Sequence, residues 1–327
     1  MKHIPIILAL LAAVGLASCS AVRHCKSPEL NLPEQIVPGR SDSLTLADLD
    51  WWEFYGDTTL CRIIERTLEH NKDLLSAAAR VERMRQLYRI DKANRLPSVG
   101  LPVYAEYETN DYYGEKSVRD PELAAKVSLG WELDMWGNLR WAKRQGGAEY
   151  LASVEAERAM RMTLVAEVAA AYFRLVALDN ELSIVRRTLI TRGEGVYQAR
   201  LRFEGGLTSE TVFQQAKVEY ATTASLIPEL ERSIETTENG ISLLMGEYPD
   251  WRVKRAKMDI EAKMRDSIPI GIPSELLQRR PDVRAAEQQL RAAMAAVGVA
   301  YADRFPRLTF RLEGGGEKNP VSEIFRS

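Results

Sequence analysis

The spacing of apolar and polar residues changes several times along the chain. From Asp57 to Asn94, apolar side chains recur every three to four residues, which predicts helix. From Ser98 to Glu108, from Lys126 to Asp134 and from Arg307 to Glu313, apolar and polar residues alternate strictly. This alternation predicts strands with one apolar and one polar face. Such strands suit a half-buried soluble sheet and equally a membrane barrel with lipid outside and water inside.

The longest periodic segment, Trp136 to Leu244, lies between the second and third alternating stretches. No proline occurs from Gly137 to Glu204, so we expect a helix of 68 residues, about 100 Å long at about 1.5 Å per residue. Gly205 and Gly206 predict a tight turn, after which a second helix returns to Leu244. Helices of this length exceed what an ordinary globular domain uses.

The expected long helix carries an interrupted apolar seam. Ten of the sixteen positions spaced three and four apart from 151 to 203 are apolar or aromatic, and four of the others are arginines. This pattern favours packing against neighbouring helices around a wet interior. A cytosolic coiled coil explains this stretch alone equally well.

A short motif occurs twice, 209 residues apart. Ala93-Asn94-Arg95-Leu96-Pro97 precedes the first alternating stretch, and Ala302-Asp303-Arg304-Phe305-Pro306 precedes the third. A helix that ends at a proline and passes into a strand is therefore expected twice, as an internal repeat. The repeat predicts a second helical hairpin beyond Ser327. We therefore expect the chain to hold about one and a quarter of two repeats and to be an incomplete version of the full design.

The N-terminus has the pattern of an export signal. A short basic start is followed by an apolar run, Ile4–Leu16, of the length of a signal peptide rather than a spanning helix. Leu16-Ala17-Ser18-Cys19 resembles the lipobox of bacterial lipoproteins, which implies cleavage before Cys19 and acylation of that residue. Ser20 in place of an aspartate resembles the outer-membrane sorting pattern. An ordinary signal peptide with a chance cysteine is the alternative.

Composition narrows the classes of function. The 44 Lys and Arg residues nearly balance 46 Asp and Glu residues, so no basic excess for a nucleic-acid partner is present. Three histidines share no spacing with the three cysteines, so we expect no metal site. Cys25 and Cys61 are compatible with a disulfide or with two free thiols. No nucleophile elbow or phosphate loop occurs, and Gly314–Gly316 lacks the Lys-Ser/Thr of such a loop, so we expect neither an enzyme nor a cofactor.

One further motif carries a family resemblance. Ile272–Glu287, with the sequence IPSELLQRRPDVRAAE, resembles the signature of TolC-like outer-membrane efflux proteins, specifically the NodT-type lipoproteins of RND efflux systems. Segments 51–57, 132–137 and 243–249 also match that family. Within the signature, we interpret Arg279, Arg280, Pro281 and Asp282 as structural. Proline is tolerated in a first helical turn, and an aspartate there complements the positive helix end.

The resemblance implies a mainly α-helical fold with membrane β-strands. Each protomer of a homotrimer would give strands to a 12-stranded outer-membrane β-barrel and long helical hairpins to a periplasmic α-barrel. Residues 1–18 would be the lipoprotein signal peptide, 19–56 a lipidated linker and 57–247 the first repeat. Residues 248–272 would belong to an equatorial layer, and 273–327 would begin the second repeat.

The implied function is that of the outer-membrane channel of a tripartite efflux system. The channel would be a passive export duct, coupled to an inner-membrane RND-type pump through a periplasmic adaptor. The docking tip for the adaptor would be formed by Gly205, Gly206, Leu207, Thr208 and Ser209. Glycine permits the positive φ of such a turn, and Thr208 or Ser209 can cap the returning helix. A simple helix-hairpin turn is the alternative for the tip, and a periplasmic adaptor-type lipoprotein is the alternative for the whole chain.

Overall fold

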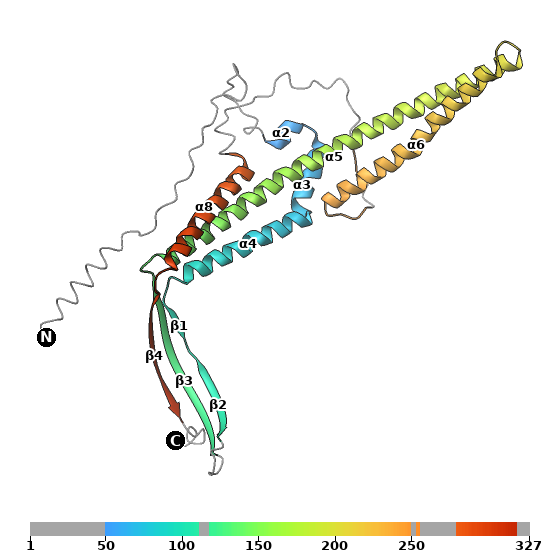
Figure 1. The fold of residues 1–327 in the computed structure, drawn as a ribbon. Coiled ribbons are helices and arrows are strands. Elements are labelled where there is room, and N and C mark those ends of the chain that lie inside the picture. Colours follow the sequence, from blue (N-terminus) through green and yellow to red (C-terminus); the bar gives the residue numbers. More distant parts are fainter. Residues whose placement is uncertain (1–49, 111–117, 250–252, 256–278, 319–327) are drawn as a thin grey trace, which may run out of the picture. The chain divides into compact units, whose positions relative to one another are not determined.

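A computed structural model describes residues 50–110, 118–249, 253–255 and 279–318. The predictions for Cys19, for Cys25 and for most of the segment 248–272 lie outside the described residues, as does the start of the signature, 272–278. The described chain forms helices of very unequal length and one sheet (Figure 1).

The single helix expected from Asp57 to Asn94 is two helices, α3 (Thr58–His70) and α4 (Lys72–Ala93). A short helix, α2 (Trp51–Tyr55), precedes them in the predicted linker. The break lies at Asn71, whose ψ of 124° is not helical. Its side-chain oxygen accepts a hydrogen bond from the Leu74 amide (3.0 Å), and its side-chain nitrogen donates to the Leu244 carbonyl (2.8 Å). Asn71 therefore caps α4 and also ties this break to a distant helix end.

Four antiparallel strands form a single sheet around β3 (Figure 1). They are β1 (Ser98–Gly100), β2 (Val103–Asn110), β3 (Val118–Leu133) and β4 (Leu308–Lys318). The first predicted strand is split at Leu101 and Pro102, and β3 begins eight residues before the predicted alternation. β1 and β2 pair with one edge of β3, and β4 pairs with its other edge.

The register confirms that the sheet has two chemically different faces. On one face Val99 opposes Leu129, which opposes Leu312, and Trp131 opposes Phe310. On the other face Ser98, Gly130 and Arg311 are in register, and Lys126 contacts the Tyr104 hydroxyl at 3.0 Å. The apolar side chains are largely exposed, including Val99 at 74% and Phe310 at 51%. This face therefore has no cover within the described residues.

The long hairpin forms almost as predicted. α5 spans Asn138–Glu204, 67 residues, and α6 spans Glu210–Leu244, 35 residues. Pro228 lies inside α6, which continues through it. The last helix, α8 (Pro281–Ala302), precedes β4 just as α4 precedes β1. The helix-proline-strand junction thus occurs twice, as the internal repeat predicts.

The chain divides into two compact units, whose boundaries fall at 80–81, 154–155 and 284–285 among the described residues. One unit contains the sheet, the end of α4, the start of α5 and α8 from Ala285 onward. In this unit α8 lies very close to α5. A Cβ atom added to Gly298 of α8 would lie only 2.4 Å from the Trp141 indole of α5.

The other unit contains α2, α3, the start of α4, α5 from Glu155 onward, α6 and the main hydrophobic core. Its fully buried members come from α3, α5 and the end of α6, among them Leu60, Ile64, Tyr172, Leu175 and Ile241. Tyr172 also donates a hydrogen bond to Asp57 (2.7 Å), and Asp57 caps the start of α3 through the amides of Thr59 and Leu60. Among the helices that the structure describes, none has the length and apolar character needed to cross a membrane.

Candidate functional site

The hairpin tip is built by a regular helix-ending motif. The Gly206 amide donates to the Phe203 carbonyl (2.9 Å), and the Leu207 amide donates to the Arg202 carbonyl (2.8 Å). Gly206 has a φ of 71°, which an L side chain adopts only with strain. The expected need for glycine is therefore met by Gly206. Ser209 occupies the N-cap position of α6, but its side chain makes no capping hydrogen bond.

The tip presents an apolar side chain to its surroundings. Leu207 is 81% exposed, whereas Thr208 is half-buried. Behind the turn, Phe203 and Phe213 stack with ring centroids 6.0 Å apart. This aromatic contact just below the turn fixes how α5 and α6 meet there. The five predicted tip residues are therefore held together on a supported loop.

Salt bridges connect the two helices of the hairpin along its length. Arg192 pairs with Glu219, and Arg186 pairs with Glu231 at 2.7 Å. All four side chains are exposed, so each pair contributes only a few tenths of a kcal/mol up to about 1 kcal/mol. These pairs favour one register of α5 against α6, but they supply little of the stability of the hairpin.

A stronger cluster closes the base of the hairpin. Arg255, just beyond α6, binds Asp179 on α5 and Glu238 on α6 through its guanidinium group. Its hydrogen bonds to Asp179, and secondarily to Glu238, raise the pKa of Arg255. Glu238 is only 7% exposed, and a buried carboxylate is stable only when it is paired. Arg255 therefore clamps both helices at once.

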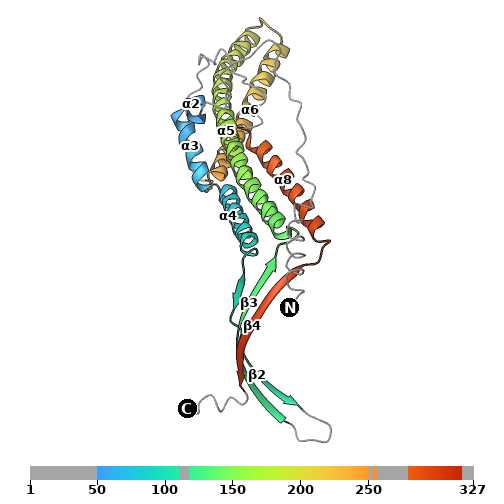
Figure 2. The ribbon, with the colours of Figure 1, turned by 90° about the vertical axis from the view of Figure 1, so that its left-hand side faces the viewer.

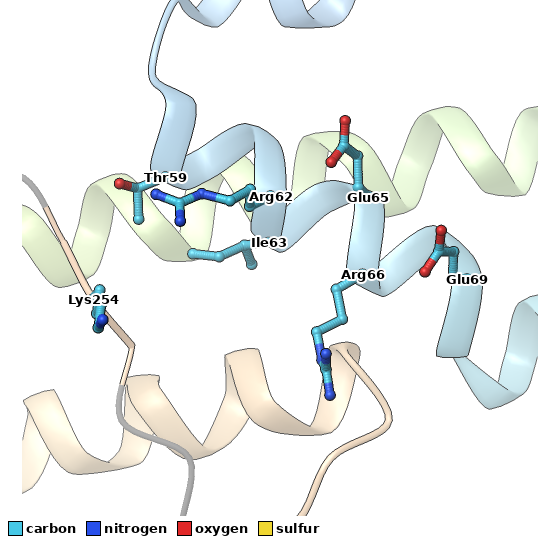
Figure 3. Close-up of a pocket in the computed structure, with 7 residues that line it drawn as sticks. All are labelled: Thr59, Arg62, Ile63, Glu65, Arg66, Glu69 and Lys254. Carbon is cyan, nitrogen blue, oxygen red and sulfur yellow. The ribbon is translucent and has the colours of Figure 1, made fainter.

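A cavity with several charged lining residues lies beside α3 in the same unit. Its lining consists of Thr59, Arg62, Ile63, Glu65, Arg66, Glu69 and Lys254, and its volume is about 520 Å³. Figure 3 shows six of these residues on α3 and Lys254 on the segment that follows α6. Arg66 turns away to pair with Glu247. Positive and negative side chains alternate along the wall, so the cavity selects no particular charge of ligand.

α3 also carries a cysteine, Cys61, whose thiol is free. Burial, with smaller contributions from Glu65 and Asp57, raises the pKa of that thiol, which makes it a weaker nucleophile at neutral pH. No group of three or more histidine, cysteine or carboxylate side chains suited to a metal ion occurs in the described part of the chain.

The described part of the signature starts α8. Pro281 is the first residue of that helix, and Asp282 lies in its first turn. Arg280 donates two hydrogen bonds to the Asp282 carboxylate (3.0 and 2.6 Å). These bonds hold the pKa of Asp282 below its usual range. Arg284 on the next turn pairs with the buried Glu155 of α5 at 2.9 Å. Arg279 and Arg280 are exposed.

Two features of this unit have no local signal in the sequence. The Arg255 clamp joins residues 76 positions apart in the case of Asp179. The Asn71 bond to Leu244 spans 173 positions. In both cases one polar side chain satisfies groups from a distant helix, which periodicity along the chain does not reveal.

The chain matches known proteins over most of its length. The model of a family described as outer membrane efflux protein matches residues 63–247 and 272–327. The chain is 28% identical to the solvent efflux pump outer membrane protein SrpC of Pseudomonas putida, covering 98% of this chain and 70% of that protein. It is 30% identical to the outer membrane protein OprJ of Pseudomonas aeruginosa, covering 97% and 67% respectively.

Solved structures with a similar fold come from the same class of protein. The chain aligns with CusC, described as forming a transmembrane channel, with a TM-score of 0.79 at 24% identity, covering 94% of this chain and 70% of that one. It aligns with the outer-membrane channel OprN with a TM-score of 0.73 at 27% identity, covering 94% and 74%. At 24% identity the likeness to CusC establishes the fold alone.

Proposed function

Because this chain belongs to the outer membrane efflux protein family, we propose that three copies of it form the wall of a passive export duct. The chain is an outer-membrane channel component of an efflux system, and the duct itself performs no chemistry. An inner-membrane RND-type pump supplies the driving force, and a periplasmic adaptor connects the pump to the duct. The family match leaves the adaptor-type lipoprotein hypothesis without support.

The single observation that carries this proposal is the two-faced sheet. Apolar side chains such as Val99, Leu312 and Phe310 are exposed on one face, while the other face carries Lys126 and Arg311. A membrane barrel needs this arrangement, with lipid against the apolar face and water against the polar face. The outer edges of β2 and β4 pair with no strand among the described residues. Because open sheet edges are not stable in lipid, strands of neighbouring copies complete the barrel.

The hairpin supplies the periplasmic part of the duct. Large apolar side chains along it are exposed, among them Ile190, Tyr197 and Val218. Neighbouring copies cover these side chains in the proposed homotrimer. The tip then becomes the adaptor contact. Leu207 is the most exposed apolar side chain of the hairpin, and its position on a rigid turn suits an apolar contact with a partner of similar hairpin shape.

The remaining assignments follow the same proposal. Cys19 is the acylated residue that adds a lipid anchor to the barrel. Arg279, Arg280, Pro281 and Asp282 have a structural role at the start of α8. Relatives are named for solvent, toluene and antibiotic efflux. We therefore propose small organic molecules as the exported class.

Cell fractionation and gel mobility test the duct. The full chain should be recovered in the outer membrane and run as a trimer on a gel unless it is boiled. Identical mobility of boiled and unboiled samples at the size of a monomer would refute the proposed trimer.

Site-specific photo-crosslinking tests the docking tip. A photoreactive amino acid at position 207 should crosslink to the periplasmic adaptor in cells of the source organism. The same group at position 243 is a matched control, because Leu243 is 76% exposed on α6 but lies about 50 Å along the helix from the tip. Equal crosslinking at both positions, or none at 207 while export is active, would exclude docking at the tip.

A further inference from the structure

The two helix-to-strand junctions share more than their sequence motif. At the first junction, the Leu96 amide donates to the Ala93 carbonyl at 2.8 Å. At the second, the Phe305 amide donates to the Ala302 carbonyl at 3.1 Å, 209 residues further on. Each junction therefore forms the same turn, and each turn carries an arginine at the same place. These arginines are Arg95 and Arg304.

A tryptophan covers each junction. The Trp131 indole nitrogen lies 3.4 Å from the Arg95 carbonyl and donates to it. The Trp136 indole nitrogen donates to the Pro306 carbonyl at 2.9 Å, and its ring stacks on Phe305 with centroids 4.7 Å apart. Both rings are still more than a third exposed, at 40% and 37%. Two exposed indoles are thus fixed beside the two arginines.

Within the described part of the chain, the junction arginines have no carboxylate partner, unlike their charged neighbours. Nearby, Arg140 pairs with Asp134, and Arg307 pairs with Asp303 at 2.9 Å. Among the residues that the structure describes, neither Arg95 nor Arg304 forms a salt bridge. Arg304 lies over the ring of Tyr301 at 5.4 Å, which leaves the hydrogen-bonding edge of its guanidinium open. Both side chains are exposed.

The register places the two junctions on either side of β3. Ser98 of β1 and Arg311 of β4 oppose the same residue, Gly130. Because neighbouring strands are about 4.8 Å apart, Ser98 and Arg311 are about 10 Å from each other across the sheet. β4 begins three residues before Arg311, at Leu308. From this level the exposed apolar face extends along the strands, with Val99 on β1 and Phe310 on β4. Figure 2 shows β3 and β4 leaving the helices side by side.

From this arrangement we infer that Arg95 and Arg304 bind the phosphate groups of anionic phospholipids in the periplasm-facing leaflet of the outer membrane. The inference goes beyond export and needs only the outer-membrane location that family membership gives. It assigns the two junctions as lipid-binding sites, one for each strand that enters the membrane from a helix.

The chemistry of the site fits this ligand. A guanidinium group offers two parallel N–H donors to two phosphate oxygens, and charge-assisted bonds of this kind are strong. Tryptophan is favoured where acyl chains meet headgroups, because the ring is apolar and the N–H is polar. Trp131 and Trp136 therefore mark the depth at which Arg95 and Arg304 meet the phosphates. The acyl chains of the same lipids then cover Val99 and its neighbours.

Lipid titration of the purified full chain tests the inference. Protein in a neutral detergent is titrated with phosphatidylglycerol that carries brominated acyl chains, and quenching of tryptophan fluorescence measures binding. Replacing Arg95→Gln or Arg304→Gln should raise the half-quenching concentration about fivefold, and replacing both about 25-fold. Raising the salt concentration from 50 to 500 mM, about a threefold shorter Debye length, should weaken wild-type binding in the same direction.

Three controls make the result decisive. Arg83→Gln removes an exposed arginine of α4, the helix before the first junction. Arg83 is twelve residues before Arg95, about 18 Å along the helix axis, and its replacement should leave binding unchanged. Arg95→Lys with Arg304→Lys keeps the charge and should retain most of the affinity even if the glutamine variant folds poorly. Soluble glycerol phosphate should not compete at equal concentration, because it lacks acyl chains. Wild-type quenching in the double glutamine variant, an equal loss in Arg83→Gln, or full competition by glycerol phosphate would each overturn the inference.

Discussion

The end of α6 offers the sharpest test of how this fold holds together. Gly246 has a φ of 71°, and a Cβ atom built on it would lie 2.5 Å from the His70 carbonyl oxygen. The obstacle is backbone at the end of α3, which cannot rotate away as a side chain can. Gly246→Ala should therefore force apart the ends of α3 and α6, which Asn71 and Leu244 also join.

The size of the effect follows from two separate costs. An L side chain in the left-handed region costs about 1–2 kcal/mol. The steric overlap with a packed neighbour adds about 1–3 kcal/mol. We therefore expect Gly246→Ala to destabilise the base of the hairpin by about 3 kcal/mol, which corresponds to about a 100-fold change in an equilibrium constant.

Two other glycines separate these costs. Gly206 has the same φ of 71° but no atom within 4 Å of its would-be Cβ. Gly206→Ala should therefore carry only the conformational cost of about 1–2 kcal/mol. Gly240 lies inside α6 with open space around it, so Gly240→Ala should stabilise the helix by about 1 kcal/mol.

Native-state hydrogen exchange measures these local effects without requiring reversible unfolding of the whole protein. The reporter is the Glu247 amide, which donates to the Ser242 carbonyl at 2.9 Å. In the Gly246→Ala variant it should exchange about 100-fold faster than in the unmodified protein. If exchange there is no faster than exchange at the turn of the Gly206→Ala variant, the backbone contact with His70 is not the cause.

Three further predictions are tested by unfolding the protein. Arg255→Met leaves the buried Glu238 without its partner and should lower the free energy of unfolding by about 2–3 kcal/mol, measured by heat or denaturant. Adding Glu238→Gln should recover part of this loss. An unchanged free energy of unfolding in Arg255→Met would show that the clamp contributes nothing. Burial, and to a smaller extent the nearby Glu149, raises the pKa of Asp91. Above this raised pKa the folded protein holds a charged carboxylate in surroundings that disfavour the charge. Asp91→Asn should therefore raise the melting temperature at neutral pH, and this gain should shrink as pH falls through the raised pKa; a gain independent of pH would contradict this. Gly298→Ala places a Cβ against the Trp141 ring and should lower the free energy of unfolding by about 1–3 kcal/mol. The readouts are a lower melting temperature and a shifted tryptophan emission. An unchanged melting temperature would mean that α8 moves aside freely.

Long periodic elements could be predicted from the sequence because many residues repeat the same signal. The expected helix from Gly137 to Glu204 differs from α5 by one residue. The strand alternation around Trp131 also placed the correct residues on one face, because a period of two leaves only one register with a continuous apolar side.

Local exceptions could not be predicted because their causes are distant. Asn71 interrupts a helical pattern that continues on both sides of it, and the Leu244 carbonyl that it binds is far along the chain. β3 begins at Val118, where arginine, aspartate and proline hide the alternation, and pairing with β2 makes those residues a strand. At the tip, Ser209 has the identity of a capping residue, but its side chain does not make the bond. Capping propensity is an average over many helix starts. The start of α6 directly follows a tight turn and departs from that average.

The position of β3 between strands from distant parts of the chain sets an order of folding. β2 and β3 are joined by a short connection and can pair as soon as both have been made. β4 reaches β3 only through pairs such as Leu133 with Leu308, 175 residues apart. Closing so large a loop is slow while the intervening chain is flexible. α5 and α6 lie within this loop, and their folding into a hairpin shortens the length of flexible chain between β3 and β4. The helical hairpin should therefore fold first. Pairing of β4 with β3 should then occur only in molecules whose hairpin has already folded.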